Sequence, residues 1–230
     1  MILEACVQEI EEVKFAAKKG FKRVELCSSL ESGGLTPSKG TIKHACKIKD
    51  IETHVMIRPR AGDFCYNFDE IAIMKADIKT CHKMGATGVV FGMLNENGKL
   101  ALENIPLIQY AISKGLEVTF HRAFDLISDK DEAVRQLISW NVKRILTSGG
   151  GSNIMEGIDV LQDLSANYLD QIEITAGSGV DADNIHFLNA AGIKAIHFSI
   201  SRASKSNNTF GFGFQRTIDR EKVTRILEAI

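Results

Sequence analysis

The chain has 230 residues, of which 44% are hydrophobic and 25% are charged, and its formal net charge at pH 7 is −1. This composition is typical of a globular protein, and the near-neutral balance offers no basic surface of the kind that binds nucleic acid. The apolar runs are too short for a membrane span, and Glu4 interrupts the plan of a secretory signal. We therefore expect a cytoplasmic protein with no nucleic-acid or membrane partner.

Short β-type runs alternate along the chain with amphipathic helical segments, an order that predicts a parallel sheet with helical crossovers. Eight such units fit the sequence, which predicts one α/β domain over residues 1–230, folded as a (β/α)8 TIM barrel. An open doubly wound sheet is the alternative. No Gly-x-Gly-x-x-Gly follows the first predicted strand, so no nucleotide cofactor is expected. The predicted strands cover residues 2–7, 23–28, 53–59, 88–94, 117–123, 144–148, 171–176 and 195–200.

The predicted strands carry polar side chains on the face that should line the barrel. Parallel strands covered on both faces normally read as continuous apolar runs, whereas here polar and apolar residues alternate, and the apolar set must face the helices. An unpaired buried charge costs several kcal/mol, so ion pairs are expected in the lumen. A structural ion-pair network is one explanation and a functional site is the other. The charged residues predicted to point inward include Glu4, Glu25, Arg58, His121, Glu173 and His197.

Several polar residues fall late in their strands or just beyond them, on the face where TIM barrels build active sites. The alternation also directs Arg58 and Arg60 inward, where Arg58 or Arg60 would clamp an anion. His121 or Glu25 would act as a general base, with Asp125 close by. These residues favour an enzyme that acts by acid–base chemistry on a small anionic substrate, phosphorylated substrates included.

Glycine-rich segments on the same face strengthen the enzyme hypothesis. Backbone N–H groups at Ser148, Gly149, Gly177 and Gly179 would suit an anion, because glycine lets a ligand approach the backbone closely. Tight turns without a ligand explain the same glycines equally well.

Two cysteines occupy equivalent places in successive strands, in a repeated Glu-x-Cys pattern. Cys6 and Cys27 would open into the same lumen, with the thioether of Met56 on the third strand. Soft sulfur ligands select Cu(I), and small buried hydrophobic side chains are the alternative explanation. Zinc fits less well, because the sequence has no Cys-x2-Cys pair and no His-Glu-x-x-His helix. The cysteines without ligand spacing are Cys46, Cys65 and Cys81.

Five segments resemble the CutC family, which is named for copper homeostasis: RVELC at 23–27, GGLTPS at 33–38, VMIRPR at 55–60, TFHRAFD at 119–125 and LTSG at 146–149. The resemblance extends from the first strand to about His197. It implies a cytoplasmic TIM-barrel protein, often a homo-oligomer, that binds Cu(I) or takes part in copper handling. It assigns copper to Cys6 and Cys27. Ala61 departs from the family pattern, which has glycine after Arg-Pro-Arg.

Two classes of function therefore stay open, a copper-binding homeostasis protein and an enzyme with a small anionic substrate. An enzyme fold without activity is a third interpretation. The segment 201–214 matches the family poorly and is predicted to be a long irregular loop before the final helix.

Overall fold

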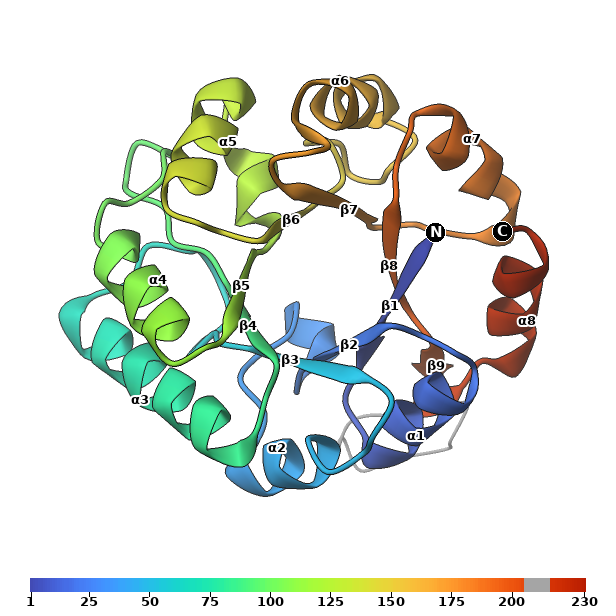
Figure 1. The fold of residues 1–230 in the computed structure, drawn as a ribbon, viewed down its shortest axis with the longest axis horizontal. Helices are drawn as coiled ribbons and strands as arrows, with labels where there is room; N and C mark the ends of the chain where they lie inside the picture. Colours follow the sequence, from blue (N-terminus) through green and yellow to red (C-terminus); the bar gives the residue numbers. More distant parts are fainter. Residues whose placement is uncertain (205–215) are drawn as a thin grey trace.

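The computed structural model describes residues 1–204 and 216–230. Within these residues the strands β1 to β8 form a closed barrel in which every strand is parallel to its neighbours, with helices around it (Figure 1). The predicted TIM barrel is confirmed and the open doubly wound sheet is wrong. The barrel strands are β1 (Ile2–Val7), β2 (Arg23–Leu26), β3 (Glu52–Met56), β4 (Gly88–Phe91), β5 (Glu117–Phe120), β6 (Arg144–Thr147), β7 (Glu173–Gly177) and β8 (Ala195–Ser199).

The helices form an outer ring that follows the chain order, and α8 lies between α7 and α1 (Figure 1). The helices are α1 (Ile10–Lys18), α2 (Lys39–Ala45), α3 (Phe68–Met84), α4 (Asn104–Ser113), α5 (Lys130–Ser139), α6 (Ile158–Tyr168), α7 (Ile185–Ala190) and α8 (Arg220–Glu228). Short 3-10 turns are η1 (Leu30–Ser32), η2 (Arg122–Leu126) and η3 (Ala182–Asn184). None of the described helices is long and apolar enough to cross a bilayer.

Sequence signals fix several helix ends. Asp129 caps α5 by accepting a hydrogen bond from the backbone N–H of Glu132, and Asn67 caps α3 in the same way through Glu70. Gly85 ends α3 with φ of +86°, in the left-handed region that favours glycine. These local signals fix where α3 and α5 begin and where α3 ends.

The alternation along the strands separates the lumen from the helix-facing core. Val24, Leu26 and Val55 point outward and are fully buried beneath the helices. Glycine on the lumen side makes room for bulky polar side chains on neighbouring strands. A Cβ on Gly88 would lie 2.4 Å from Nδ1 of His54, and one on Gly92 would lie 2.8 Å from Nδ1 of His121. The two glycines are therefore part of how the barrel accommodates buried histidines.

Most barrel strands end earlier than the sequence predicted. Strand β3 ends at Met56 instead of continuing to residue 59, so the alternation no longer controls the residues beyond it. The segment predicted as an irregular loop at 201–214 begins as a strand. β9 (Ser201–Ala203) pairs antiparallel with β10 (Arg216–Ile218), and positions 205–214 lie outside the described residues.

Candidate functional site

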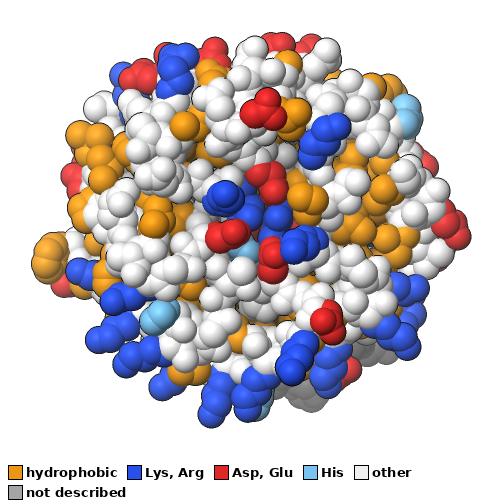
Figure 2. Space-filling view, in the orientation of Figure 1, with side chains coloured by type: hydrophobic (Ala, Val, Ile, Leu, Met, Phe, Trp, Pro, Cys, Tyr) orange, Lys and Arg blue, Asp and Glu red, His pale blue; other side chains and the backbone are white. Residues whose placement is uncertain are grey.

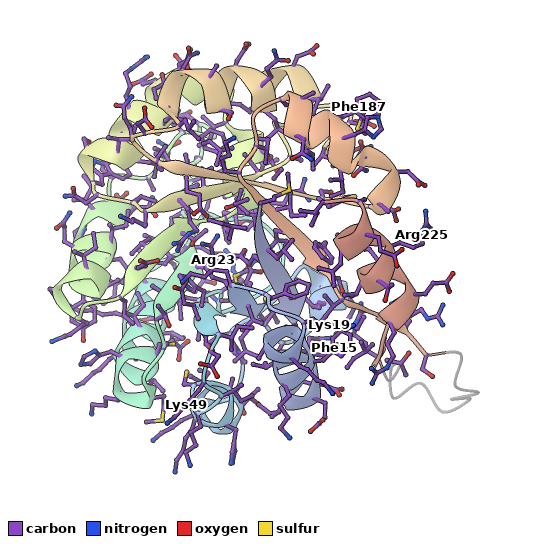
Figure 3. All side chains as sticks on the ribbon, turned by 45° about the vertical axis from the view of Figure 1, so that its right-hand side comes forward. Phe15, Lys19, Arg23, Lys49, Phe187 and Arg225 are labelled. Carbon is purple, nitrogen blue, oxygen red and sulfur yellow. The ribbon has the colours of Figure 1, made fainter. Side chains whose placement is uncertain are left out.

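One end of the lumen, where the strands begin, is filled by an ion-pair network. Arg23 donates to Glu4 through Nε at 2.8 Å and also binds Glu173. Arg144 donates to Glu117 at 2.6 Å and to Glu173 at 3.3 Å. Figure 2 shows acidic and basic side chains gathered over the middle of the barrel, and Figure 3 shows Arg23 inside it. These paired charges, of which Arg23, Glu4 and Arg144 are buried, fill this end of the barrel, as the structural explanation of the polar lumen requires.

Further along the lumen, two thiols and a carboxyl group meet. Cys6 and Cys27 lie on adjacent strand paths, and both thiols face Oε1 of Glu25, at 3.9 Å and 3.2 Å. The ligand atoms of these three residues all lie within 4.8 Å of one another. The cysteines pack with Met56 and Val90 in one small buried cluster. The sequence prediction that Cys6, Cys27 and Met56 share one lumen agrees with this geometry.

The buried groups of this cluster shift one another's ionisation. The hydrogen bond from Cys27 lowers the pKa of the Cys6 thiol to about 6, with help from His197 and against the effect of burial. Cys27 moves the other way, because its hydrogen bond to Cys6 and its burial raise its pKa well above the ordinary value. Burial raises the pKa of Glu25 to about 8. These opposite shifts favour Cys6 over Cys27 as the thiolate, the form in which cysteine binds metals.

A second group of ligand atoms adjoins the sulfur cluster and shares Glu25 with it. One carboxylate oxygen each from Glu4 and Glu25 and one imidazole nitrogen of His197 lie within 4.8 Å of one another. Nδ1 of His197 is 2.8 Å from Oε1 of Glu4. Burial lowers the pKa of His197, but the charge of Glu25 and hydrogen bonds to Cys6 and Glu4 outweigh it and raise the pKa well above its ordinary value.

At the opposite end of the barrel, Asp125 organises the loop after β6. Its carboxylate accepts hydrogen bonds from the backbone N–H groups of Ser148 and Gly150, and from the hydroxyl groups of Thr147 and Ser148. Arg122 also pairs with it at 2.7 Å. The amide of Ser148, which the sequence suggested for an external anion, is thus directed, together with that of Gly150, at a carboxylate of the chain itself. An external anion would have to compete with Asp125.

Removing this carboxylate should expose its role. We expect Asp125→Ala to lower the free energy of unfolding by about 2–4 kcal/mol, because buried donors lose a charged acceptor. Asp125→Asn, which keeps one acceptor oxygen, should cost less. Asp63→Ala is the control, since the Asp63 side chain is 70% exposed. Urea denaturation measures all three, and a cost below about 1 kcal/mol for Asp125→Ala would contradict this role.

Arg58 ties loops together at the mouth of the barrel. Its guanidinium group donates to the backbone carbonyl groups of Ser32, Gly34 and Gly62. The side chain is buried, and its Cζ lies 5.1 Å from the centroid of the Phe64 ring. Most of the guanidinium N–H donors of Arg58 are therefore used in hydrogen bonds within the chain.

The inward orientation expected for Arg60 is wrong. Arg60 donates to Glu70 at 2.5 Å, to Asp63 at 3.0 Å and to the carbonyl group of Cys65. Its side chain is 35% exposed. The reason is that β3 has ended four residues earlier, at Met56, so Arg60 belongs to the loop that leads into α3.

His121 points inward as predicted, but it is neutral. Burial lowers its pKa to about 3, and the nearby charge of Arg58 adds to the effect. Nδ1 accepts a hydrogen bond from the backbone N–H of Ala123, and the ring lies 4.7 Å from that of Phe64, centroid to centroid. The side chain is thus held in a mainly apolar setting.

The remaining glycines of the predicted anion site have packing roles. A Cβ on Gly149 would lie 2.2 Å from the carbonyl oxygen of Gly157, and one on Gly177 would lie 2.7 Å from Cδ1 of Leu146. Gly179 has φ of +78°. Close backbone approach and turn geometry account for these three positions without a ligand.

Sequence reasoning missed two members of the ion-pair network, Arg144 and Glu117. Each is the first residue of its strand and in phase with inward residues further along, with Ser148 for Arg144 and with Thr119 for Glu117. Extending the alternation to the first residue of every strand would have found both.

The chain has close relatives. The model of the CutC family matches residues 1–202. A CutC protein of Glaesserella parasuis serovar 5 is 46% identical over 200 residues, which cover 86% of this chain and 82% of the relative. One from Vibrio cholerae serotype O1 is 41% identical over 210 residues, covering 90% and 83%. The crystal structure of the "Putative Copper Homeostasis Protein CutC" of Streptococcus agalactiae matches with a TM-score of 0.81 at 36% identity, over 86% of this chain and 97% of that one.

Proposed function

The chain belongs to the CutC family, and from that premise we propose that it takes part in copper homeostasis by binding Cu(I) through Cys6 and Cys27. The observation that carries the proposal is the convergence of two buried thiols and a thioether. Cys6, Cys27 and Met56 share one cluster inside the barrel. Thiolate and thioether sulfur are the ligands that select Cu(I) over harder cations. We also propose that it acts in the cytoplasm as a homo-oligomer, as the family resemblance implies.

Apolar side chains pack around the two thiols. Cys27 is fully buried and Cys6 is 7% exposed, and Val90 and Leu30 pack against them. These apolar neighbours keep water away from the sulfur atoms, and Glu25 lies against both thiols. Gly34 covers the site, since a Cβ there would lie 3.3 Å from Sγ of Cys27.

The Cu(I) site can be tested by replacing its thiols. Under anaerobic reducing conditions, Cys6→Ser and Cys27→Ser should each weaken Cu(I) binding at least about tenfold, and the double variant at least about 100-fold, because each removes one of two strong ligands. Competition with a chromophoric Cu(I) chelator gives the affinities. Cys46→Ser is the control and should leave the affinity unchanged, because Cys46 lies outside the cluster. Wild-type affinity in the double variant would overturn the proposal.

A further inference from the structure

Three adjacent strands bring oxygen and nitrogen ligands together beside the thiols. Glu4 of β1 and His197 of β8 are direct register partners, and Glu25 of β2 stands next to them across the β1–β2 pair. One ligand atom of each lies within 4.8 Å of those of the other two. Glu4 and Glu25 are both buried, so the three side chains meet in the closed interior of the barrel.

Glu25 has unused coordination capacity. Its Oε1 receives both thiols, while its Oε2 is buried and finds no hydrogen-bond partner among the described residues. A buried carboxylate oxygen without a partner is costly. Arg23 pairs with Glu4, and within the described part of the chain no ion pair reaches Glu25.

We propose that Glu4, Glu25 and His197 form a second metal site, which binds a divalent cation of the Zn(II) class through two carboxylate oxygens and one imidazole nitrogen. Bonds of about 2.0–2.2 Å to such an ion place neighbouring ligand atoms about 3.4 Å apart. Nδ1 of His197 and Oε1 of Glu4 are 2.8 Å apart, so the site requires only small side-chain movements.

The donor set separates this site from the Cu(I) site. Carboxylate and imidazole ligands suit divalent ions, whereas the thiols suit Cu(I). Arg23 donates to Oε2 of Glu4 at 2.8 Å and would orient that carboxylate from outside the coordination sphere. The proposal goes beyond copper binding: the two ligand groups share Glu25, and Glu4 and His197 belong to the second group alone.

Co(II) is a suitable probe because its visible spectrum reports the ligands. In the variant Cys6→Ser/Cys27→Ser, Co(II) titration should give one bound equivalent without thiolate-to-metal charge transfer. His197→Gln in that background should weaken Co(II) binding at least about tenfold. His54→Gln is the matched control, because His54 is also a buried histidine of the lumen but lies outside the ligand group; its Co(II) affinity should be unchanged.

Two further measurements separate a lost site from a lost fold. Circular dichroism and urea denaturation of His197→Gln should show a folded barrel, so that lost Co(II) binding reports the site and not the fold. Wild-type protein loaded with Cu(I) should still bind one equivalent of Co(II), which covers the case in which the double serine variant does not fold. The proposal of a second site is overturned if Cu(I)-loaded protein binds no Co(II). It is also overturned if His197→Gln and His54→Gln weaken Co(II) binding equally. Absence of Cu(I) binding by wild type would instead overturn the proposed function alone.

Discussion

Replacing Arg23 by methionine should lower the free energy of unfolding by about 3–5 kcal/mol, because it removes the buried cation that Glu4 and Glu173 share. Arg23 is 2% exposed, donates to Glu4 at 2.8 Å and also binds Glu173. Methionine preserves most of the side-chain volume, so the loss reflects charge more than packing. Urea denaturation followed by circular dichroism measures the effect.

Two controls isolate the buried charge. Arg225→Met removes a surface ion pair with Asp183, in which the Arg225 side chain is 51% exposed and that of Asp183 is 83% exposed. This substitution should change the free energy of unfolding by less than about 0.5 kcal/mol. In the triple variant Arg23→Met/Glu4→Gln/Glu173→Gln the orphaned charges are gone, and much of the lost stability should return. If Arg23→Met costs less than about 1 kcal/mol, the network does not close the barrel in the way that its geometry indicates.

The second large effect is a pH dependence that comes from His121. Burial, aided by the charge of Arg58, lowers its pKa to about 3 from an ordinary value of 6.5. Below pH 6.5 the unfolded chain takes up a proton at this residue, whereas the folded protein does so only near pH 3. His121 therefore makes the folded protein progressively less stable as the pH falls, by about 3 kcal/mol at pH 4.5.

Comparing His121→Gln with wild type at two pH values isolates this contribution from other titrating groups. At pH 7.5 His121 is neutral in both the folded and the unfolded wild-type protein, so the free energy of unfolding of the variant differs from that of wild type only by the packing cost of the substitution. At pH 4.5 wild type carries the additional penalty and the variant does not, so the difference in unfolding free energy should shift in favour of the variant by about 3 kcal/mol. An unchanged difference between the two pH values would mean that His121 is protonated in the folded protein.

The period of two along each strand predicted several of the side chains that enter the lumen. Glu4, Glu25, Glu173 and His197 contribute to the hydrogen bonds of the interior, because a strand embedded in a sheet must send alternate side chains to opposite faces. The rule failed for Arg60, where the chain had left the strand. Local alternation is reliable only while backbone pairing continues.

Local sequence patterns did not predict which groups the loop amides and glycines contact. The sequence suggested Ser148 and Gly149 as part of an anion site, and the structure directs the amide of Ser148 at Asp125, 23 positions earlier in the chain. Likewise the glycines suggested ligand approach, while Gly149 and Gly177 are closely packed against the chain itself. Glycine signals a close approach, but it does not say whether the approaching group is a ligand or another part of the protein.

The sequence by itself determined the barrel, its polar lumen and the proximity of the free thiols of Cys6 and Cys27. Periodicity and strand order are local properties, and a closed parallel sheet converts them directly into geometry. Only the tertiary structure decided how the charges are shared. His197 is 193 positions from Glu4 in sequence and 2.8 Å from it in space, since closing the barrel places β8 beside β1. The stability and metal preference of each buried group depend on such partners, because a charge in a low-dielectric interior is governed by its nearest neighbours.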